Sequence, residues 1–231
     1  MRMRPPLALL FLASLTAHAH DLWVERDTSG LTLRYGHERS GHGGARVLEY
    51  APEQVREALC HDSDGRPLKA RVSPTWPVRL LADCAVSLFV FSTGYWSKTP
   101  QGTKNLPKTE AGTVFDSWLS IESVKRIDAW GEALTRPLTQ GLELTPLENP
   151  LRLKPGDKLH LAVFQAGRPA AGVTVAYFGQ PRGVTDRDGR INIALRRPGF
   201  QLIQASIETP LADGKADRRV ETAALQFELP Q

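Results

Sequence analysis

The stretch HDLWVERDTSGLTLRYGH (His20–His37) predicts a β-hairpin, and it indicates the class of the whole chain. Apolar and polar residues alternate on both sides of the turn-forming letters DTSG, as they do in half-buried strands. A turn over these four residues pairs positions whose numbers sum to 57, so that Leu22 faces Tyr35. This register collects the apolar side chains on one face, whereas a slip of one residue would mix the two faces.

Similar alternating runs recur along the chain, and turn-forming Gly, Pro and Asp separate them. Helix patterns are few: Ala51–Leu59 could form two helical turns, and Ser117–Trp130 fits either a helix or a strand. We therefore expect an all-β chain of the β-sandwich type. The runs that predict strands are HDLWVE, LTLRYG, AVSLFVFS, LELTPLE, KLHLAVFQ, VTVAYFG, RINIAL, FQLIQASIE and TAALQFEL.

The pattern predicts two β-sandwich-like domains behind an N-terminal targeting segment. Residues 20–135 form the expected N-terminal β domain, and residues 92–113, rich in Lys, Thr, Gly and Pro, form a long irregular loop within it. Closely spaced strands then follow, which predicts a C-terminal antiparallel sandwich over residues 140–231, of Ig-like or prealbumin-like type. We expect this second unit to fold on its own.

The first nineteen residues have the three parts of a secretion signal. Arg2 and Arg4 give a positive start, the letters LALLFLASL form an apolar core, and Ala17-His18-Ala19 fits the small-x-small cleavage pattern. We expect cleavage after Ala19 and a periplasmic or secreted protein; the alternative is an uncleaved N-terminal anchor. Cleavage removes two of the 29 Lys and Arg that stand against 25 Asp and Glu. No basic stripe interleaved with aromatic residues indicates nucleic-acid binding.

The chain has two cysteines, Cys60 and Cys84. In an oxidising compartment two cysteines usually pair, so we expect a disulfide between them. The alternative is a thiolate metal site, but neither cysteine has a second one at ligand spacing.

The hairpin register places His20 opposite His37, where side chains of neighbouring strands have Cβ atoms about 5 Å apart. Cleavage after Ala19 would make His20 the N-terminal residue. Its free α-amine and a ring nitrogen could then chelate one ion, while His37 adds a third nitrogen. Such an all-nitrogen site, a histidine brace, suits copper or nickel. His42, on a Gly-rich stretch after His37, is a candidate fourth ligand.

Other interpretations of these residues stay open. The two histidines could be ordinary polar residues at the end of a sheet. Cleavage after Ala17 would instead start the chain with His18-Ala19-His20, which is also a copper and nickel chelator. Tyr35 lies two residues inward from the pair and fits the core better than an axial ligand position. We assign structural roles to His61 and His160.

Four segments carry a family resemblance: HAHDLWVE at 18–25, the Gly36-His37 pair, Gly141–Phe178 and Gly183–Glu208. Together they resemble the family of domain of unknown function 4198. The resemblance implies an exported bacterial protein of a family sometimes labelled as a nickel- or cobalt-uptake component. That label includes a transmembrane region, and no stretch after the signal reaches the roughly 20 apolar residues that a membrane helix needs. The segments GRPAAGVTV and TDRDGRINI also resemble carboxypeptidase-regulatory-like or transthyretin-like sandwiches.

Three functions fit these observations. The first, which we favour, is a periplasmic metal-binding accessory protein for the uptake or handling of nickel, cobalt or copper, with a membrane metal transporter as its partner. The second is a metal-free β-sandwich scaffold that binds a protein or a glycan. The third is a copper-dependent oxidative enzyme, which needs a redox-active metal with an open coordination position. After cleavage we expect neither membrane insertion nor nucleic-acid binding.

Overall fold

The computed structural model describes residues 20–38 and 46–230. These residues form short 3-10 helices at Pro52–Gln54, Glu132–Thr135 and Pro150–Arg152, and otherwise strands and their connections. The strands are β1 (Asp21–Asp27), β2 (Gly30–Gly36), β3 (Val55–His61), β4 (Arg71–Val72), β5 (Arg79–Leu81), β6 (Val86–Thr99), β7 (Gly102–Lys104), β8 (Asp116–Ile127), β9 (Glu143–Pro146), β10 (Lys158–Gln165), β11 (Arg168–Pro169), β12 (Thr174–Tyr177), β13 (Gln180–Val184), β14 (Arg190–Ala194), β15 (Gly199–Pro210) and β16 (Arg218–Leu229).

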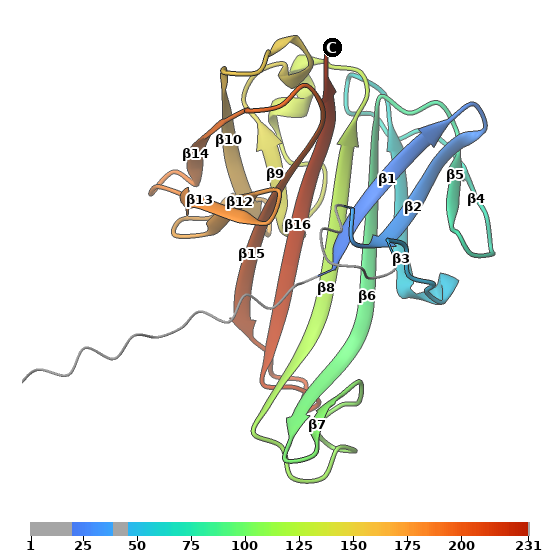
Figure 1. Ribbon diagram of the computed structural model, residues 1–231, viewed down its shortest axis with the longest axis vertical. Coiled ribbons are helices and arrows are strands. Elements are labelled where there is room, and N and C mark those ends of the chain that lie inside the picture. Colours follow the sequence, from blue (N-terminus) through green and yellow to red (C-terminus); the bar gives the residue numbers. More distant parts are fainter. Residues whose placement is uncertain (1–19, 39–45, 231) are drawn as a thin grey trace, which may run out of the picture.

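The strands form three sheets, which confirms the all-β fold class (Figure 1). The largest has the order β13-β12-β15-β16-β8-β6-β3, with β7 beside β6. A four-stranded sheet, β1-β2-β5-β4, covers one of its faces, and a sheet of β11-β10-β14 with β9 covers the other. Neighbouring residues of β16 show this layering, because Ala224 packs in the core on one side and Leu225 in the core on the other.

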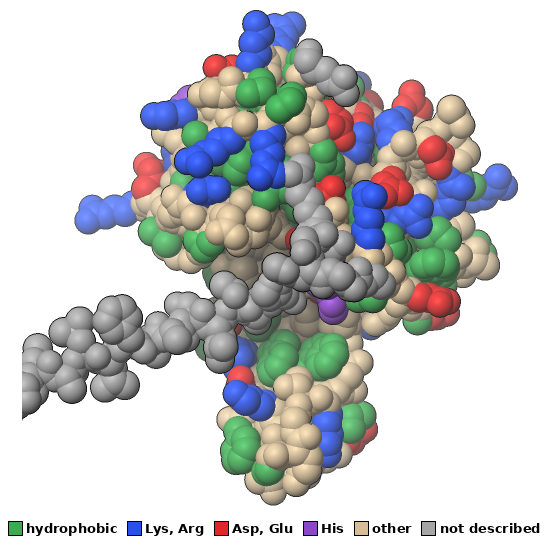
Figure 2. Space-filling view, in the orientation of Figure 1, with side chains coloured by type: hydrophobic (Ala, Val, Ile, Leu, Met, Phe, Trp, Pro, Cys, Tyr) green, Lys and Arg blue, Asp and Glu red, His purple; other side chains and the backbone are tan. Residues whose placement is uncertain are grey.

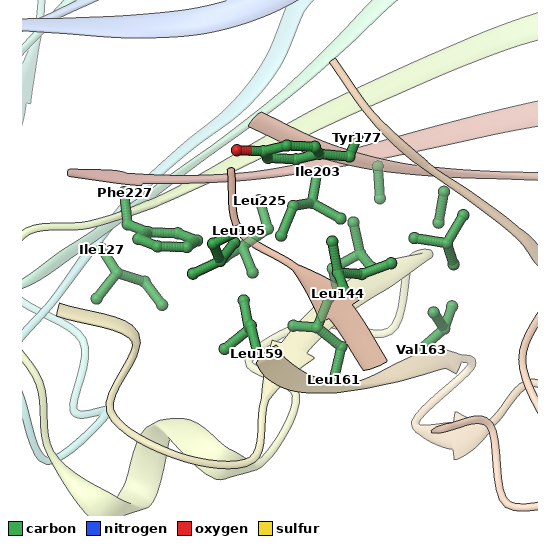
Figure 3. Close-up of a cluster of buried hydrophobic side chains, with 14 of the residues drawn as sticks. Ile127, Leu144, Leu159, Leu161, Val163, Tyr177, Leu195, Ile203, Leu225 and Phe227 are labelled. Carbon is green, nitrogen blue, oxygen red and sulfur yellow. The ribbon is translucent and has the colours of Figure 1, made fainter. Parts of the chain in front are cut away.

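Two apolar cores hold the layers together. The larger core lies between the long sheet and the β10 sheet, where Leu225 and Phe227 of β16 share one cluster with Leu159 and Leu161 of β10 (Figure 3). Burying one Leu or Phe side chain in this way stabilises a protein by about 1.5–3 kcal/mol. The smaller core lies beneath the first hairpin and includes Leu33.

The register expected for the first hairpin is confirmed. β1 pairs antiparallel with β2, and Leu22 faces Tyr35. Gly30 begins β2 with a φ of 138°, and a Cβ atom there would lie 2.5 Å from the carbonyl oxygen of Leu80 on β5. The turn therefore needs glycine both for its backbone angle and for the close approach of the neighbouring strand. The sequence pattern set the pairing because only one register buries the apolar face.

Several segments become strands although their sequence favours other structures. Residues 92–99 and 102–104, expected in an irregular loop, belong to β6 and β7. Residues 117–127 of the ambiguous segment belong to β8. Ala51–Leu59, which could have formed two helical turns, is a 3-10 turn followed by the start of β3. The cause is lateral pairing, since β6 lies beside β8 with Trp96 directly opposite Trp118. The composition of a segment does not reveal which distant strand will pair with it.

The long sheet takes strands from both expected domains, because β16 pairs in parallel with β8. A buried ion pair crosses the same boundary: Lys125 Nζ on β8 lies 2.6 Å from Glu143 Oε1 on β9. Their side chains are only 4% and 2% exposed. Independent folding of residues 140–231 stays a prediction.

The disulfide prediction is confirmed. Cys60 on β3 is bonded to Cys84, which lies just before β6, with Cα atoms 5.3 Å apart. This distance is within the range usual for disulfides. Within the described ranges, no helix is both long and apolar enough to cross a membrane.

Candidate metal centre

His20 and His37 lie next to each other at the open end of the first hairpin. Their ring centroids are 4.9 Å apart, and the rings meet edge to face at 62°. Both side chains are half-buried. A metal–nitrogen bond is about 2 Å long, so two imidazoles at this separation can turn toward one shared ion. The structure therefore brings together the two histidines that the register paired.

Backbone contacts fix the end of the hairpin that carries His37. The backbone N–H of His37 donates to the carbonyl of Arg46 at 2.8 Å, and the N–H of Leu48 donates to the carbonyl of Tyr35 at the same distance. The backbone on both sides of His37 is thus held by the chain that returns after it. His37 can present its ring without rearranging β2.

Tyr35 contributes more than core packing. Its ring packs against Phe91 of β6, with centroids 4.9 Å apart, as a core residue would. Its hydroxyl, however, lies 2.9 Å from Nδ1 of His20. Burial raises the pKa of Tyr35 well above its usual value, and the negative charge of Glu122 raises it further. The phenol is therefore neutral and available as a hydrogen-bond donor to the imidazole.

The imidazole of His20 is held in its neutral form. Burial lowers the pKa of His20 below its usual value, and the nearby His37 lowers it further, while Asp21 acts in the opposite direction. Neutral imidazole is the form that binds a metal ion. The lowered pKa of His20 thus favours metal binding by this ring at neutral pH.

Asp21 ties this end of the hairpin to the long sheet. Its Oδ1 accepts a hydrogen bond of 3.0 Å from Nε2 of Gln204 on β15, and its Oδ2 accepts one of 3.3 Å from the backbone of Glu38. Oε1 of Gln204 in turn accepts from the backbone N–H of Gly179 in the β12–β13 turn. These bonds position His20, the neighbour of Asp21, over the sheet.

Glu122 is an acidic neighbour of Tyr35 and Asp21 that the sequence alone does not predict. It lies on β8, between Phe91 of β6 and Thr222 of β16. Burial raises the pKa of Glu122 to about 7, with the charge of Asp21 as a second cause. No local pattern marks this residue, because its place beneath the hairpin depends on pairings between strands far apart in the sequence.

The other histidines singled out in the sequence are His42, His61 and His160. His42 lies outside the described residues. His61 is buried beside the disulfide, and Nδ1 of exposed His160 pairs with Glu148 at 2.6 Å. Within 20–38 and 46–230, no group of three or more His, Cys, Asp and Glu side chains has a metal-binding arrangement. The described side chains thus supply two of the expected ligands, and the amine of a cleaved His20 would supply the third.

The first hairpin lies within a stretch that matches a known family. A family model described as "Domain of unknown function (DUF4198)" matches residues 17–209. The chain belongs to the DUF4198 family. The DUF4198 match includes the two histidines and ends within β15, so that β16 lies beyond the matched residues. A search of curated proteins finds no match for this DUF4198 chain.

Proposed function

We propose that this protein is an exported, periplasmic metal-binding accessory protein that takes part in the uptake or handling of nickel, cobalt or copper. The metal is held by the α-amine and ring of His20, after cleavage at Ala19, and by the ring of His37. His42 is a further candidate ligand. The observation that carries the proposal is the 4.9 Å separation of the two half-buried rings. A membrane metal transporter is the proposed partner.

The donor set fits this class of metal. Imidazole and amine nitrogens suit copper and nickel, whereas a calcium or magnesium site would need oxygen ligands. The label of nickel- or cobalt-uptake component that the family resemblance implies agrees with these donors. The C-terminal part, which we propose to be transthyretin-like, then serves as the scaffold that carries the hairpin.

Metal binding changes the contacts of His20. In a brace the amine and Nδ1 of the same residue bind the ion together, so the metal takes the place that the Tyr35 hydroxyl holds at 2.9 Å. The phenol would stay close to His20, because its ring is packed against Phe91. Tyr35 would then be a neighbour of the bound ion and not one of its ligands.

The experiment compares three purified proteins whose first residue is established by mass. They are the form beginning at His20, a form with one Ala added before His20, and His37→Ala. Nickel, cobalt and copper are titrated into each by calorimetry. We expect both altered forms to bind at least tenfold more weakly, because each loses one nitrogen and the extension also breaks the chelate ring. His160→Ala is the matched control, an exposed histidine on the outer face of β10.

Neither change removes core volume, so the thermal midpoint should stay within about 2 °C of the parent protein. Equal affinities of the native and extended forms would reject the brace. Turnover of a reductant by the copper-loaded protein would favour the oxidative enzyme instead. Absence of binding by all three metals would leave the metal-free scaffold.

A further inference from the structure

Positive charge is concentrated in one part of the chain. Residues 149–200 contain nine Lys and Arg against three Asp and no Glu. The other residues from His20 onward contain eighteen Lys and Arg against twenty-two Asp and Glu. The segment that forms β10 to β14 therefore carries a net charge of +6, while the rest of the chain from His20 is negative.

Among the residues that the structure describes, the cations of this segment have no carboxylate ion-pair partners. All nine are exposed, and none forms an ion pair with a carboxylate of the described residues. In contrast, eight cations elsewhere in the described chain do form such pairs: Arg26, Arg34, Arg66, Arg79, Lys108, Lys125, Arg126 and Arg218. Every cation of this segment is thus without a carboxylate partner among the described residues, whereas many of the cations elsewhere have one.

Three of these arginines gather around the turn between β12 and β13, and we call them the arginine cluster. Arg182 on β13 lies over the ring of Tyr177 at 5.9 Å. The backbone N–H of Arg196 donates to the Tyr177 hydroxyl at 3.2 Å, and Arg197 lies over the ring of Phe178 at 5.2 Å. In Figure 2, Lys and Arg side chains (blue) gather over the region where Figure 1 places β13, β14 and the start of β15.

The aromatic base of the arginine cluster is packed against both cores. Phe178 has a φ of 49°, and Gly179 has a φ of 71°. Two positive φ values are usual in a tight hairpin turn, but Asn or Asp normally takes the first position. Phe178 is held there because its ring packs against both cores and lies 6.0 Å from the ring of Phe200. The ring that Arg197 lies over is therefore held in place by its packing.

We propose that the arginine cluster docks the protein on the surface of a bilayer that contains anionic phospholipids. Guanidinium groups bind phosphate oxygens in pairs of parallel hydrogen bonds, which suits lipid phosphates. The nine cations are distributed over β10, β11, β13, β14 and the turns beside them, which matches an extended anionic surface better than a small acidic patch. Val184, which is 60% exposed on β13, offers apolar contact within the same surface.

The test measures co-sedimentation of the full protein with vesicles. One vesicle set contains phosphatidylglycerol mixed with phosphatidylcholine, and the other contains phosphatidylcholine alone. The first variant is Arg182→Gln, Arg196→Gln and Arg197→Gln together. The matched control is Lys69→Gln, Lys98→Gln and Lys104→Gln, which removes the same charge from exposed, unpaired positions outside the segment. A third variant replaces the three arginines by lysine, which keeps the charge.

We expect the parent protein to bind the phosphatidylglycerol vesicles in low salt and to leave them as salt is raised. Each basic residue near an anionic surface adds about fivefold to the affinity, so the Gln variant of the arginine cluster should lose on the order of 100-fold. The lysine control should lose only a few-fold, and the Arg→Lys variant, which keeps the charge but loses the paired hydrogen bonds, should bind between the parent protein and the Gln variant. Circular dichroism establishes that each variant is folded.

Three outcomes would overturn the proposal. They are equal binding to phosphatidylcholine alone, absence of binding to either vesicle set, and equal losses in the arginine cluster variant and the lysine control. The last would show that only net charge matters. None of these measurements involves metal, so their result is independent of the proposed metal site.

Discussion

Replacing Lys125 by Met tests how much the buried ion pair between β8 and β9 stabilises the folded protein. Lys125 Nζ and Glu143 Oε1 are 2.6 Å apart, and both side chains are almost fully buried. Glu143 also accepts hydrogen bonds from the backbone N–H groups of Leu138 and Thr139. Removing the cation leaves a buried carboxylate with no counter-charge, which costs about 3–5 kcal/mol of unfolding free energy.

The size of this loss can be measured directly. For a domain of this length each kcal/mol lowers the thermal midpoint by about 2–4 °C, so Lys125→Met should melt roughly 6–20 °C below the parent protein. Urea unfolding at pH 7, followed by circular dichroism, gives the free energy itself. The double variant Lys125→Met with Glu143→Gln should recover most of the loss, because Gln is uncharged and still accepts from Leu138 and Thr139.

The dependence on pH gives a second, independent check. Burial alone would raise the pKa of Glu143, but the charge of Lys125 and the hydrogen bonds hold it below its usual value of 4.5. Because the pKa of Glu143 is lower in the folded than in the unfolded protein, the ionised carboxylate stabilises the fold. This stabilisation is lost as the pH falls through the folded pKa. In Lys125→Met the stranded carboxyl instead favours its protonated form, so the variant should gain stability from pH 7 to pH 5. A loss below 1 kcal/mol, or the absence of this gain, would refute the reasoning.

Two further predictions concern the surroundings of His20. Tyr35→Phe removes the hydroxyl that occupies Nδ1 of His20, so the nickel affinity measured by calorimetry should not fall. A tenfold weaker affinity would instead show that the metal binds Nε2 and that Tyr35 orients the ring. Glu122→Gln should change how stability varies with pH. Because burial raises the folded pKa of Glu122 to about 7, the parent protein loses stability as the pH rises from about 4.5 to 7, and the variant should lose about 1–3 kcal/mol less over this range in urea unfolding. Parallel pH profiles of the two proteins would contradict this assignment.

The features that the sequence predicts well are local ones. The first hairpin is specified by a turn and by alternation within eighteen residues, from His20 to His37, and its register follows from burial of one face. The disulfide follows from the count of two cysteines. Each of these needs no knowledge of the rest of the chain.

The features that the sequence does not predict depend on distant partners. Glu122 and Lys125 both lie on β8, a segment whose pattern fits a helix as well as a strand. Their neighbours lie on β16, β6 and β9. The parallel pairing with β16 involves no short turn that the sequence could reveal. The hydrogen bond of Tyr35 was missed for another reason, since a half-buried tyrosine on an apolar face gives no sign of where its hydroxyl points.

The position of β16 also sets the order in which the strands of the long sheet can pair during folding. β16 lies between β8 and β15 in the middle of the long sheet, and Arg218 pairs with Trp118, 100 positions earlier. A chain that emerges from its N-terminal end therefore presents β8 as an open edge until residues 218–229 arrive. Pairing across such a long stretch is slow, and an open edge attracts other strands. For a chain that crosses a membrane with its N-terminal end first, as the proposed export implies, the central sheet closes only after residues 218–229 have emerged on the far side.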